Sequence, residues 1–235
     1  MKDKILEAVQ ISKTYGEGES AVQALKASDL TIWKGEFASI IGSSGSGKST
    51  LLKILGGLLP PTTGNVLLDG QDLYAMNAEQ LAQVRRQKIG FIFQDFRLFP
   101  EYTVRDNILI PFYLDHRTPD EQMLRKLTEI LGIAEKLDAR PSQISGGQQQ
   151  RAAIARALIT KPKVLLLDEP LAALDLKLRQ RMLIELDTIH DDVGITFIFV
   201  THDQQEAMSI SDHIAVLRGG HVEQIGTPPE LYRSE

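Results

Sequence analysis

The sequence has 235 residues, with 26 Lys and Arg, 31 Asp and Glu, no Cys and a formal net charge of -5. Its 43% hydrophobic and 24% charged residues exclude a disordered chain, and the absence of Cys excludes disulfide scaffolds, thiolate metal sites and Cys nucleophiles. The mild acidity argues against broad nucleic-acid binding, and no apolar run is long enough for a signal peptide or a membrane-spanning helix.

Short apolar runs alternate with longer amphipathic stretches, which predicts a parallel sheet with crossover helices. The expected strands are Ile5–Ile11, Phe37–Ile41, Ile89–Phe93, Val164–Leu167, Ile195–Val200 and Ile214–Leu217. The expected helices are Lys48–Leu55, Ala78–Arg86, Pro119–Leu131, Gly146–Thr160, Lys177–His190 and Gln204–Ile210. Pro60, Pro61, Gly64 and Gly70 mark a turn-rich piece in which we expect short antiparallel strands. Residues 95–160 contain no good strand, so we expect a helical subdomain inserted into the α/β core.

A glycine-rich loop follows the strand Phe37–Ile41 and precedes a helix. The loop matches the pattern G-x-x-x-x-G-K-[ST] with Gly42, Ser43, Ser44, Gly45, Ser46, Gly47, Lys48, Ser49 and Thr50. Glycines let consecutive backbone N–H groups point at an anion, and the helix N-terminus adds partial positive charge. We therefore expect nucleotide phosphates here, with Lys48 on the β- and γ-phosphates and Ser49 on Mg²⁺. The alternative, a flexible Gly/Ser linker, does not account for the flanking strand and helix.

Two carboxylates, Asp168 and Glu169, end the apolar strand Val164–Leu167. Ligands of α/β sheets bind at the carboxyl ends of the strands, so these residues are expected beside the glycine-rich loop. Asp168 would then hold Mg²⁺, and Glu169 would orient a water for attack on the γ-phosphate. A helix-capping pair before Pro170 is the structural alternative. To this point the residues allow a small-molecule kinase, a GTPase, a motor or a transport ATPase.

The run from Ile144 to Arg151, ISGGQQQR, resembles the signature motif of ABC ATPases and precedes Asp168 as in that family. The resemblance implies an α/β fold: a P-loop NTPase (RecA-like) core with a short antiparallel β subdomain and an inserted helical subdomain. It also implies a single ABC ATPase domain over residues 1–235, with 1–94 and 161–235 as the ATP-binding core and 95–160 as the helical signature subdomain. In this family Ser145, Gly147 and Gln148 complete the ATP site of a partner chain, in a homodimer or with a paired ATPase subunit. An ordinary N-cap at Ser145 has the same local geometry.

Four further positions match motifs of the family. Gln94 resembles the Q-loop glutamine, which contacts Mg²⁺ or the attacking water, and Asp175 ends a D-loop-like run that begins at Ala172. His202 resembles the switch histidine that contacts the γ-phosphate. Tyr15 matches the aromatic residue that stacks on adenine, although an exposed Tyr in a turn needs no ligand. The resemblance thus implies ATP hydrolysis with Mg²⁺, catalysed by Glu169, His202, Gln94 and Lys48.

Three uses of such an ATPase can be compared. DNA-handling relatives insert long coiled coils or zinc sites between the two phosphate motifs, and translation-factor relatives carry two ATPase copies; neither feature is present here. A transporter therefore fits best, without a nucleic-acid partner and peripheral on the cytoplasmic face of the inner (plasma) membrane. Transmembrane permease subunits are expected to dock near Phe96–Tyr102, where the family has a groove for a coupling helix. A local core of the helical subdomain is the alternative.

The transported substrate is indicated differently by the two halves of the chain. Residues up to about Leu114 resemble lipoprotein-release and macrolide-export ATPases, whereas residues from about Gln143 onward resemble importer ATPases, the polyamine-importer group most of all. We expect import of polyamine-like solutes with an extracytoplasmic solute-binding protein, and keep export or lipoprotein release as the alternative. In the polyamine group a C-terminal regulatory domain usually follows; here the sequence either had that domain removed or belongs to a member without it.

Overall fold

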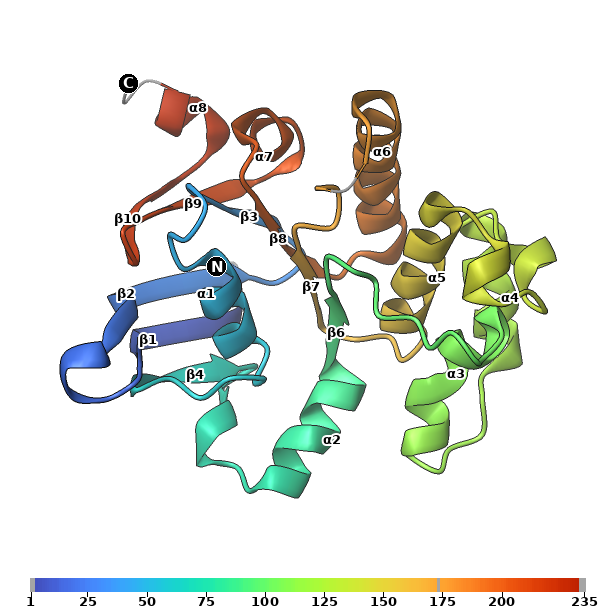
Figure 1. Cartoon of the computed structure of the whole chain (residues 1–235), viewed down its shortest axis with the longest axis horizontal. Coiled ribbons are helices and arrows are strands. Elements are labelled where there is room, and N and C mark those ends of the chain that lie inside the picture. The colour runs from blue at the N-terminus through green and yellow to red at the C-terminus, as the bar shows by residue number, and fades with distance from the viewer. Residues whose placement is uncertain (1–2, 173, 233–235) are drawn as a thin grey trace.

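The computed structural model describes residues 3–172 and 174–232, which form two sheets and the helices around them (Figure 1). The six-stranded sheet consists, in spatial order, of β10 (His221–Gly226), β9 (His213–Arg218), β3 (Phe37–Ile41), β8 (Thr196–Thr201), β7 (Val164–Asp168) and β6 (Ile89–Ile92). Strands β9, β3, β8, β7 and β6 are parallel, and β10 is antiparallel to β9 at the edge. The predicted parallel sheet is confirmed.

A four-stranded antiparallel sheet lies on the other side of α1. It consists of β2 (Val22–Trp33), β1 (Lys4–Tyr15), β4 (Thr63–Leu68) and β5 (Gln71–Asp72). The short antiparallel strands predicted around Gly64 and Gly70 are confirmed as β4 and β5. The sheet is larger than predicted, because it also contains β1 and β2. The strand expected at Ile5–Ile11 in the parallel sheet is therefore wrong in its pairing, and β2 was not predicted at all.

The helices are α1 (Lys48–Leu55), α2 (Ala78–Lys88), α3 (Val104–Leu114), α4 (Glu121–Ile130), α5 (Gly146–Leu158), α6 (Leu176–Val193), α7 (Gln204–Ile210) and α8 (Pro228–Tyr232). Short 3₁₀ turns lie at Gly18–Ser20, Leu73–Ala75, Ala134–Lys136 and Pro141–Gln143. Helices α1 and α7 have the predicted bounds. The segment between β6 and β7 contains three helices, in agreement with the predicted absence of strands there. Helix α3 was not predicted, because Pro111 lies inside it and proline is unfavourable within a helix. Among the described residues, no helix combines the length and apolar character needed to cross a bilayer.

Alternating side chains of the central strands enter two different hydrophobic cores. Phe197 and Phe199 of β8 pack in a core with Phe37 and residues of α3–α6. Ile198 and Val200 of the same strand pack on the opposite face, with α1 and the antiparallel sheet. Since successive strand residues point to opposite faces, a strand buried on both sides is expected to be apolar along its centre, as β8 is at residues 197–200. Helix α1 thus lies between the sheets, and α3–α6 cover the far face (Figure 1).

Asp115, directly after α3, connects this helix to α2. Its buried carboxylate accepts hydrogen bonds from the side chains of Arg86 and Gln87. Burial opposes ionisation of Asp115, but these hydrogen bonds and the charges of Arg86 and Arg117 outweigh it and lower the pKa of the carboxyl. We expect Asp115→Asn to reduce the free energy of unfolding at neutral pH, because it removes the charged acceptor of the Arg86 hydrogen bond. The reduction should be only about 1 kcal/mol, since Arg86 is partly exposed and solvent screens the pair.

The pH dependence follows from the lowered pKa. A carboxyl with a lowered pKa in the folded state stabilises the protein above its unfolded pKa, about 3.9, and loses this contribution as the pH falls through the folded value. Urea unfolding should therefore separate wild type from Asp115→Asn at pH 7, and the difference should shrink progressively as the pH falls below about 3.9. Asp138→Asn, at an exposed position, is the matched control. A difference that stays constant as the pH falls would contradict this account.

Candidate functional site

The glycine-rich loop between β3 and α1 curls around the side chain of Lys48. This side chain is only 4% exposed, and its Nζ donates hydrogen bonds to the carbonyl oxygens of Gly42 and Ser43, at 2.9 and 3.1 Å. The same ammonium lies 3.5 Å from a carboxylate oxygen of Glu169. The structure thus brings the predicted phosphate-binding lysine and the predicted base into contact.

Neighbouring strands explain why glycine is needed in the loop. Gly47 has φ 101°, and a Cβ atom there would lie 2.5 Å from the carbonyl oxygen of Ala24 in β2. A Cβ atom on Gly42 would lie 2.2 Å from the carbonyl oxygen of Leu217 in β9. Such distances are shorter than any real contact, so the loop can approach these strands only without side chains at both positions. Ala24 and Leu217 were not predicted as part of the site.

Asp168, the last residue of β7, reaches the start of α1. Its carboxylate accepts a hydrogen bond of 2.8 Å from the hydroxyl of Ser49. Burial raises the pKa of the Asp168 carboxyl, and the hydrogen bond from Ser49 opposes that shift. A hydroxyl and a carboxylate placed together are the oxygen ligands that Mg²⁺ prefers.

Glu169 occupies a strained position at the turn after β7. Its φ angle is 45°, in the left-handed region that non-glycine residues seldom adopt, and its N–H donates to the carbonyl oxygen of Val200 at 3.1 Å. Its carboxylate lies 3.4 Å from Nδ1 of His202, whose ring is 54% exposed. Lys48 and His202 therefore flank one carboxylate from two sides. Backbone strain of this kind is concentrated at functional sites.

A cavity of about 450 Å³ opens over the loop. Its lining residues are Ala24, Ser44, Gly45, Gly47, Lys48, Ser49, Thr50, Gln94 and Glu169. Within the loop, the Ser46 hydroxyl is buried and has no hydrogen-bond partner among the described protein residues. This unsatisfied donor, the Lys48 ammonium and the loop amides suit a phosphate chain, while Ser49 and Asp168 suit its metal ion. The residues present thus fit both groups.

Tyr15, at the end of β1, lies at the side of this cavity rather than among its lining residues. Its hydroxyl is 3.5 Å from that of Thr50, and the ring is 43% exposed. The ammonium of Lys13 lies 5.5 Å from the ring centroid. The ring is therefore accessible close to the loop, in a place where a base could stack on it.

The signature residues lie away from the loop of their own chain. Ser145 caps α5: its hydroxyl accepts from the N–H of Gln148, whose side chain accepts in return from the Ser145 N–H. Cβ atoms on Gly146 or Gly147 would meet nothing within 4 Å, so this helix start faces open space. None of these residues lines the cavity over the loop. Ser145 therefore has the N-cap geometry that is expected both for a signature motif and for an ordinary helix start.

The D-loop segment also forms a helix cap. The Asp175 carboxylate accepts a hydrogen bond of 3.0 Å from the N–H of Leu178 at the start of α6. Ala173, within the same predicted motif, lies outside the described residues. As with the signature motif, Asp175 is not among the residues that line the loop cavity.

The predicted docking segment Phe96–Tyr102 is only partly exposed. Phe99 and Tyr102 are about half exposed with ring centroids 5.9 Å apart, whereas Phe96 is 9% exposed and Leu98 packs against the core. The alternative, a local core, therefore applies to Phe96 and Leu98 but not to the exposed rings of Phe99 and Tyr102. A cavity of about 550 Å³ extends the exposed surface onto α3; its lining residues are Phe99, Tyr102, Asp106, Ile110, Tyr113 and Leu114.

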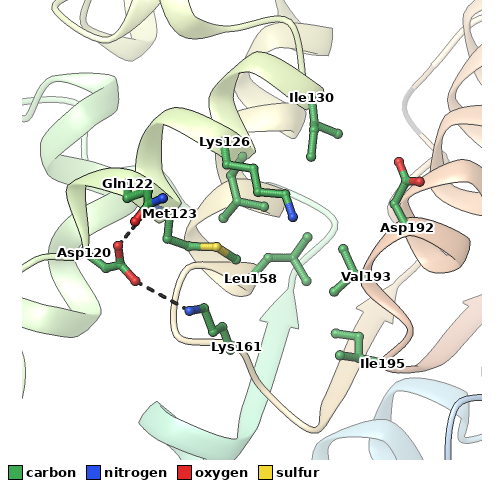
Figure 2. Close-up of a pocket in the computed structure, with 11 residues that line it drawn as sticks. Asp120, Gln122, Met123, Lys126, Ile130, Leu158, Lys161, Asp192, Val193 and Ile195 are labelled. Atoms are coloured by element: carbon green, nitrogen blue, oxygen red, sulfur yellow. Dashed lines mark hydrogen bonds and ion pairs between the residues drawn. The ribbon is translucent and has the colours of Figure 1, made fainter.

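Another cavity, of about 680 Å³, lies between α4 and the C-terminal ends of α5 and α6 (Figure 2). Apolar side chains such as Met123 and Val193 form much of it, and the Lys161 ammonium pairs with Asp120 at 3.5 Å on its rim. Ile195, just before β8, places this cavity at the amino ends of the parallel strands. None of the motif residues lines it, so the loop cavity is the candidate site.

Comparison with known sequences gives one family. The family model described as ABC transporter matches residues 25–172. The spermidine/putrescine import ATP-binding protein PotA of Protochlamydia amoebophila is 52% identical over 212 residues, 89% of this chain and 55% of that protein. The protein of the same description from Fusobacterium nucleatum is 48% identical over 237 residues, covering 100% of this chain and 60% of that protein. The chain therefore spans little more than half the length of these relatives.

Solved structures give the same result for the fold. The ATP-binding cassette MJ0796, described as dimeric in a post-hydrolysis state bound to ADP and Pi, is 37% identical with a TM-score of 0.85. The match covers 95% of this chain and 99% of that chain. The protein cbiO1 from Clostridium perfringens, described as part of the ABC transporter complex cbiONQ, is 30% identical with a TM-score of 0.87, over 99% of this chain and 92% of that one. The predicted P-loop NTPase fold class is confirmed.

Proposed function

The chain belongs to the ABC transporter family, and from this premise we propose that it is the ATP-hydrolysing subunit of an importer of polyamine-like small solutes. The observation that carries the proposal is the convergence of Lys48, Ser49, Asp168 and Glu169 at one loop. The curated relatives are described as import proteins, and their similarity extends over both halves of the chain. This favours import over the export or lipoprotein-release alternative, although the N-terminal motifs resemble export ATPases.

The substrate ATP would bind with its phosphates over the loop. Backbone N–H groups of residues 42–47 and the Lys48 ammonium would hold the β- and γ-phosphates, and Tyr15 would stack on the adenine. Ser49, Asp168 and Gln94 would hold Mg²⁺, which when bound neutralises negative charge on the phosphates. The hydroxyl of Ser49 is oriented toward Asp168, so the two oxygen ligands lie side by side.

Hydrolysis would depend on the groups around Glu169. Its carboxylate would orient a water molecule in line with the γ-phosphate and accept its proton, while Gln94 lines the same cavity. His202, on the exposed side of Glu169, would contact the γ-phosphate and limit the motion of the carboxylate. Lys48 would stabilise the charge that develops on the phosphate oxygens.

A second ATPase subunit would complete the site. Ser145, Gly147 and Gln148 lie at the start of a helix that faces open space at Gly146 and Gly147, which suits a phosphate chain bound to another subunit. Asp175 would cross the same interface. A head-to-tail dimer, either a homodimer or with a paired ATPase subunit, would use both helix starts. The dimeric state described for MJ0796 supports a dimer.

The exposed apolar surface at Phe99 and Tyr102 would receive the permease subunits. We propose that residues 95–160 act as a helical signature subdomain, inserted between the ATP-binding core formed by 1–94 and 161–235. The chain would then lie peripherally on the cytoplasmic face of the inner membrane. An extracytoplasmic solute-binding protein would deliver the substrate on the other side, and no nucleic acid would be involved.

Transport in proteoliposomes tests this function. The assembly of this subunit with its permease should take up spermidine when ATP is supplied on the side of the ATPase and the solute-binding protein on the other side. Omission of ATP should abolish uptake. ATP-driven release of a lipoprotein or extrusion of a macrolide, without spermidine uptake, would contradict import and favour the alternative.

We expect Phe99→Ala to weaken coupling more than ATP binding. The aromatic ring is half exposed and lines the cavity beside α3, so its loss removes contact area for a permease helix without altering the loop cavity. Spermidine uptake per ATP hydrolysed should fall about fivefold or more, the scale expected for loss of an aromatic interface anchor. Tyr232→Ala, at an exposed aromatic residue of α8, is the matched control. Equal uptake per ATP in the Phe99 variant would contradict the docking assignment.

A further inference from the structure

A buried hydroxyl lies directly before His202 in the chain. Thr201, the last residue of β8, is 3% exposed, and its hydroxyl donates to a carboxylate oxygen of Glu206 at 2.5 Å. The same hydroxyl oxygen accepts from the N–H of Asp203 at 3.0 Å. Threonine hydroxyls form such turns by bonding to the backbone two residues on. One hydroxyl therefore joins the two neighbours of His202 and closes the turn that carries it.

Glu206, in the first turn of α7, directs this hydroxyl. The residue is only 8% exposed, so its carboxylate depends on partners within the protein. Burial disfavours the charged form and raises the pKa of Glu206, while the hydrogen bond from Thr201 acts in the opposite direction. The backbone of the same helix turn is fixed as well, because the Asp203 carboxylate accepts from the N–H groups of Gln205 and Glu206 at 2.8 and 3.3 Å.

Arg179 of α6 holds the other side of the Glu206 carboxylate. Its Nε lies 3.6 Å from a carboxylate oxygen of Glu206, and its Nη1 lies 4.0 Å from one of Asp203. Nη2 donates to the carbonyl oxygen of Leu174 at 3.0 Å, so the guanidinium is itself fixed near the start of α6. Since a planar guanidinium keeps its donors in a rigid fork, these contacts restrict where the Glu206 carboxylate can lie. The group that directs Thr201 is thus anchored on a helix outside the turn.

His202 depends on this turn for its position. More than half of its ring is exposed, so packing constrains the ring little, yet Nδ1 lies 3.4 Å from the Glu169 carboxylate. A side chain that meets a reacting group is held in the productive geometry by hydrogen bonds of the residues behind it. Here those hydrogen bonds lie at the residues on either side of His202. Loss of the Thr201 hydroxyl would deprive the Glu206 carboxylate of a donor and the Asp203 N–H of its acceptor, and the turn would relax.

We propose that Glu206 is a positioning residue for ATP hydrolysis, which acts through the hydroxyl of Thr201. Held by Arg179, the Glu206 carboxylate orients this hydroxyl, and the hydroxyl fixes the turn that places His202 beside Glu169. The inference rests on the proposed ATPase function and adds to it residues that do not touch the nucleotide. Because Thr201, Glu206 and Arg179 do not line the loop cavity, their loss should lower turnover while ATP binding persists.

The test compares Thr201→Val with Thr196→Val in the full chain, assembled with its permease. Both variants replace a buried hydroxyl of β8 with a methyl group; that of Thr196, at the other end of the strand, accepts from the N–H of Gly35 at 2.9 Å. We expect Thr201→Val to lower kcat about 10- to 100-fold and to change the Kd for ATP less than about twofold, because His202 is no longer aligned. Thr196→Val should keep the wild-type kcat even if it lowers stability. Thr201→Ser, which keeps the hydroxyl, should restore most of the turnover.

A double-mutant cycle separates positioning from a purely structural role. If the network acts through His202, Thr201→Val should lower kcat little further in a His202→Ala background. Multiplicative effects would overturn the proposal, and so would an equal loss of kcat in Thr196→Val. If Thr201→Val does not fold, Glu206→Gln serves in the same cycle, with a smaller loss of kcat because the amide oxygen still accepts from Thr201. An inactive wild-type assembly would overturn the proposed ATPase function itself, whereas active wild type with an unchanged kcat in Thr201→Val would overturn only the positioning role.

Discussion

Replacing Glu169 with Gln is expected to reduce kcat for ATP hydrolysis by about 10²- to 10⁴-fold, the contribution typical of a general base. The substitution keeps the size of the side chain but removes the charge that accepts a proton. ATP binding should persist, because the Lys48 ammonium keeps its hydrogen bonds to the carbonyl oxygens of Gly42 and Ser43. Removal of the neighbouring carboxylate also removes a competitor for that ammonium, 3.5 Å away, so affinity for ATP should not fall.

Single-turnover hydrolysis and gel filtration with ATP together test this prediction. The variant should accumulate as an ATP-bound dimer, since hydrolysis no longer opens it, whereas wild type should pass through that state. Glu79→Gln, at an exposed position of α2, is the matched control and should retain wild-type turnover. Near-normal turnover in Glu169→Gln would mean that the base is misassigned, and loss of ATP binding would mean that Glu169 shapes the loop instead.

The parts of the site that could be predicted from sequence are those built from contiguous residues. The loop from Gly42 to Thr50 and the pair Asp168 and Glu169 carry their own strand and helix signals, and the topology of a parallel sheet then requires them to meet. The hydrogen bond from Ser49 to Asp168, across 119 positions of sequence, follows from that topology.

The antiparallel sheet was harder to predict, because bulges interrupt the alternation of apolar residues. The pairing of β1 with β2 shifts register between Ala8 and Ile11, and Gln10 there has a positive φ of 48°. Each shift moves the following side chains to the other face, so no period of two extends over the whole strand. The contribution of Ala24 to the loop cavity was missed with β2, since only tertiary packing brings this strand beside Gly47.

The docking loop shows a different limit of sequence interpretation. The resemblance implied a docking surface near Phe96–Tyr102, but the sequence could not distinguish the buried from the exposed side chains of this segment. In the structure Phe96 points into the protein while Phe99 stays exposed, a division made by the left-handed turn and the hydrogen bonds from Arg156. That turn depends on a helix about 60 residues away, so no local pattern could reveal it.

Replacing Lys48 with Met should weaken ATP binding about 10- to 100-fold, the loss expected for one or two charge-assisted hydrogen bonds. Methionine keeps the unbranched stem in a position that is only 4% exposed, so packing is largely conserved and the lost group is the ammonium. Without it, Glu169 faces the phosphates with no cation 3.5 Å away, and repulsion between the two anions adds to the loss. Isothermal titration with ATP measures the change directly.

Lys48→Met and Glu169→Gln together distinguish binding from turnover. The first should raise the Kd for ATP, whereas the second should leave Kd unchanged and lower kcat, because of these two residues only Lys48 binds the phosphates directly in the proposed site. Lys126→Met, at an exposed position of α4, controls for the loss of one positive charge. The Lys48 ammonium also satisfies two loop carbonyls, so thermal unfolding without nucleotide must be compared as well. Wild-type ATP affinity combined with a lower melting temperature would mean that this ammonium stabilises the loop and does not bind phosphate.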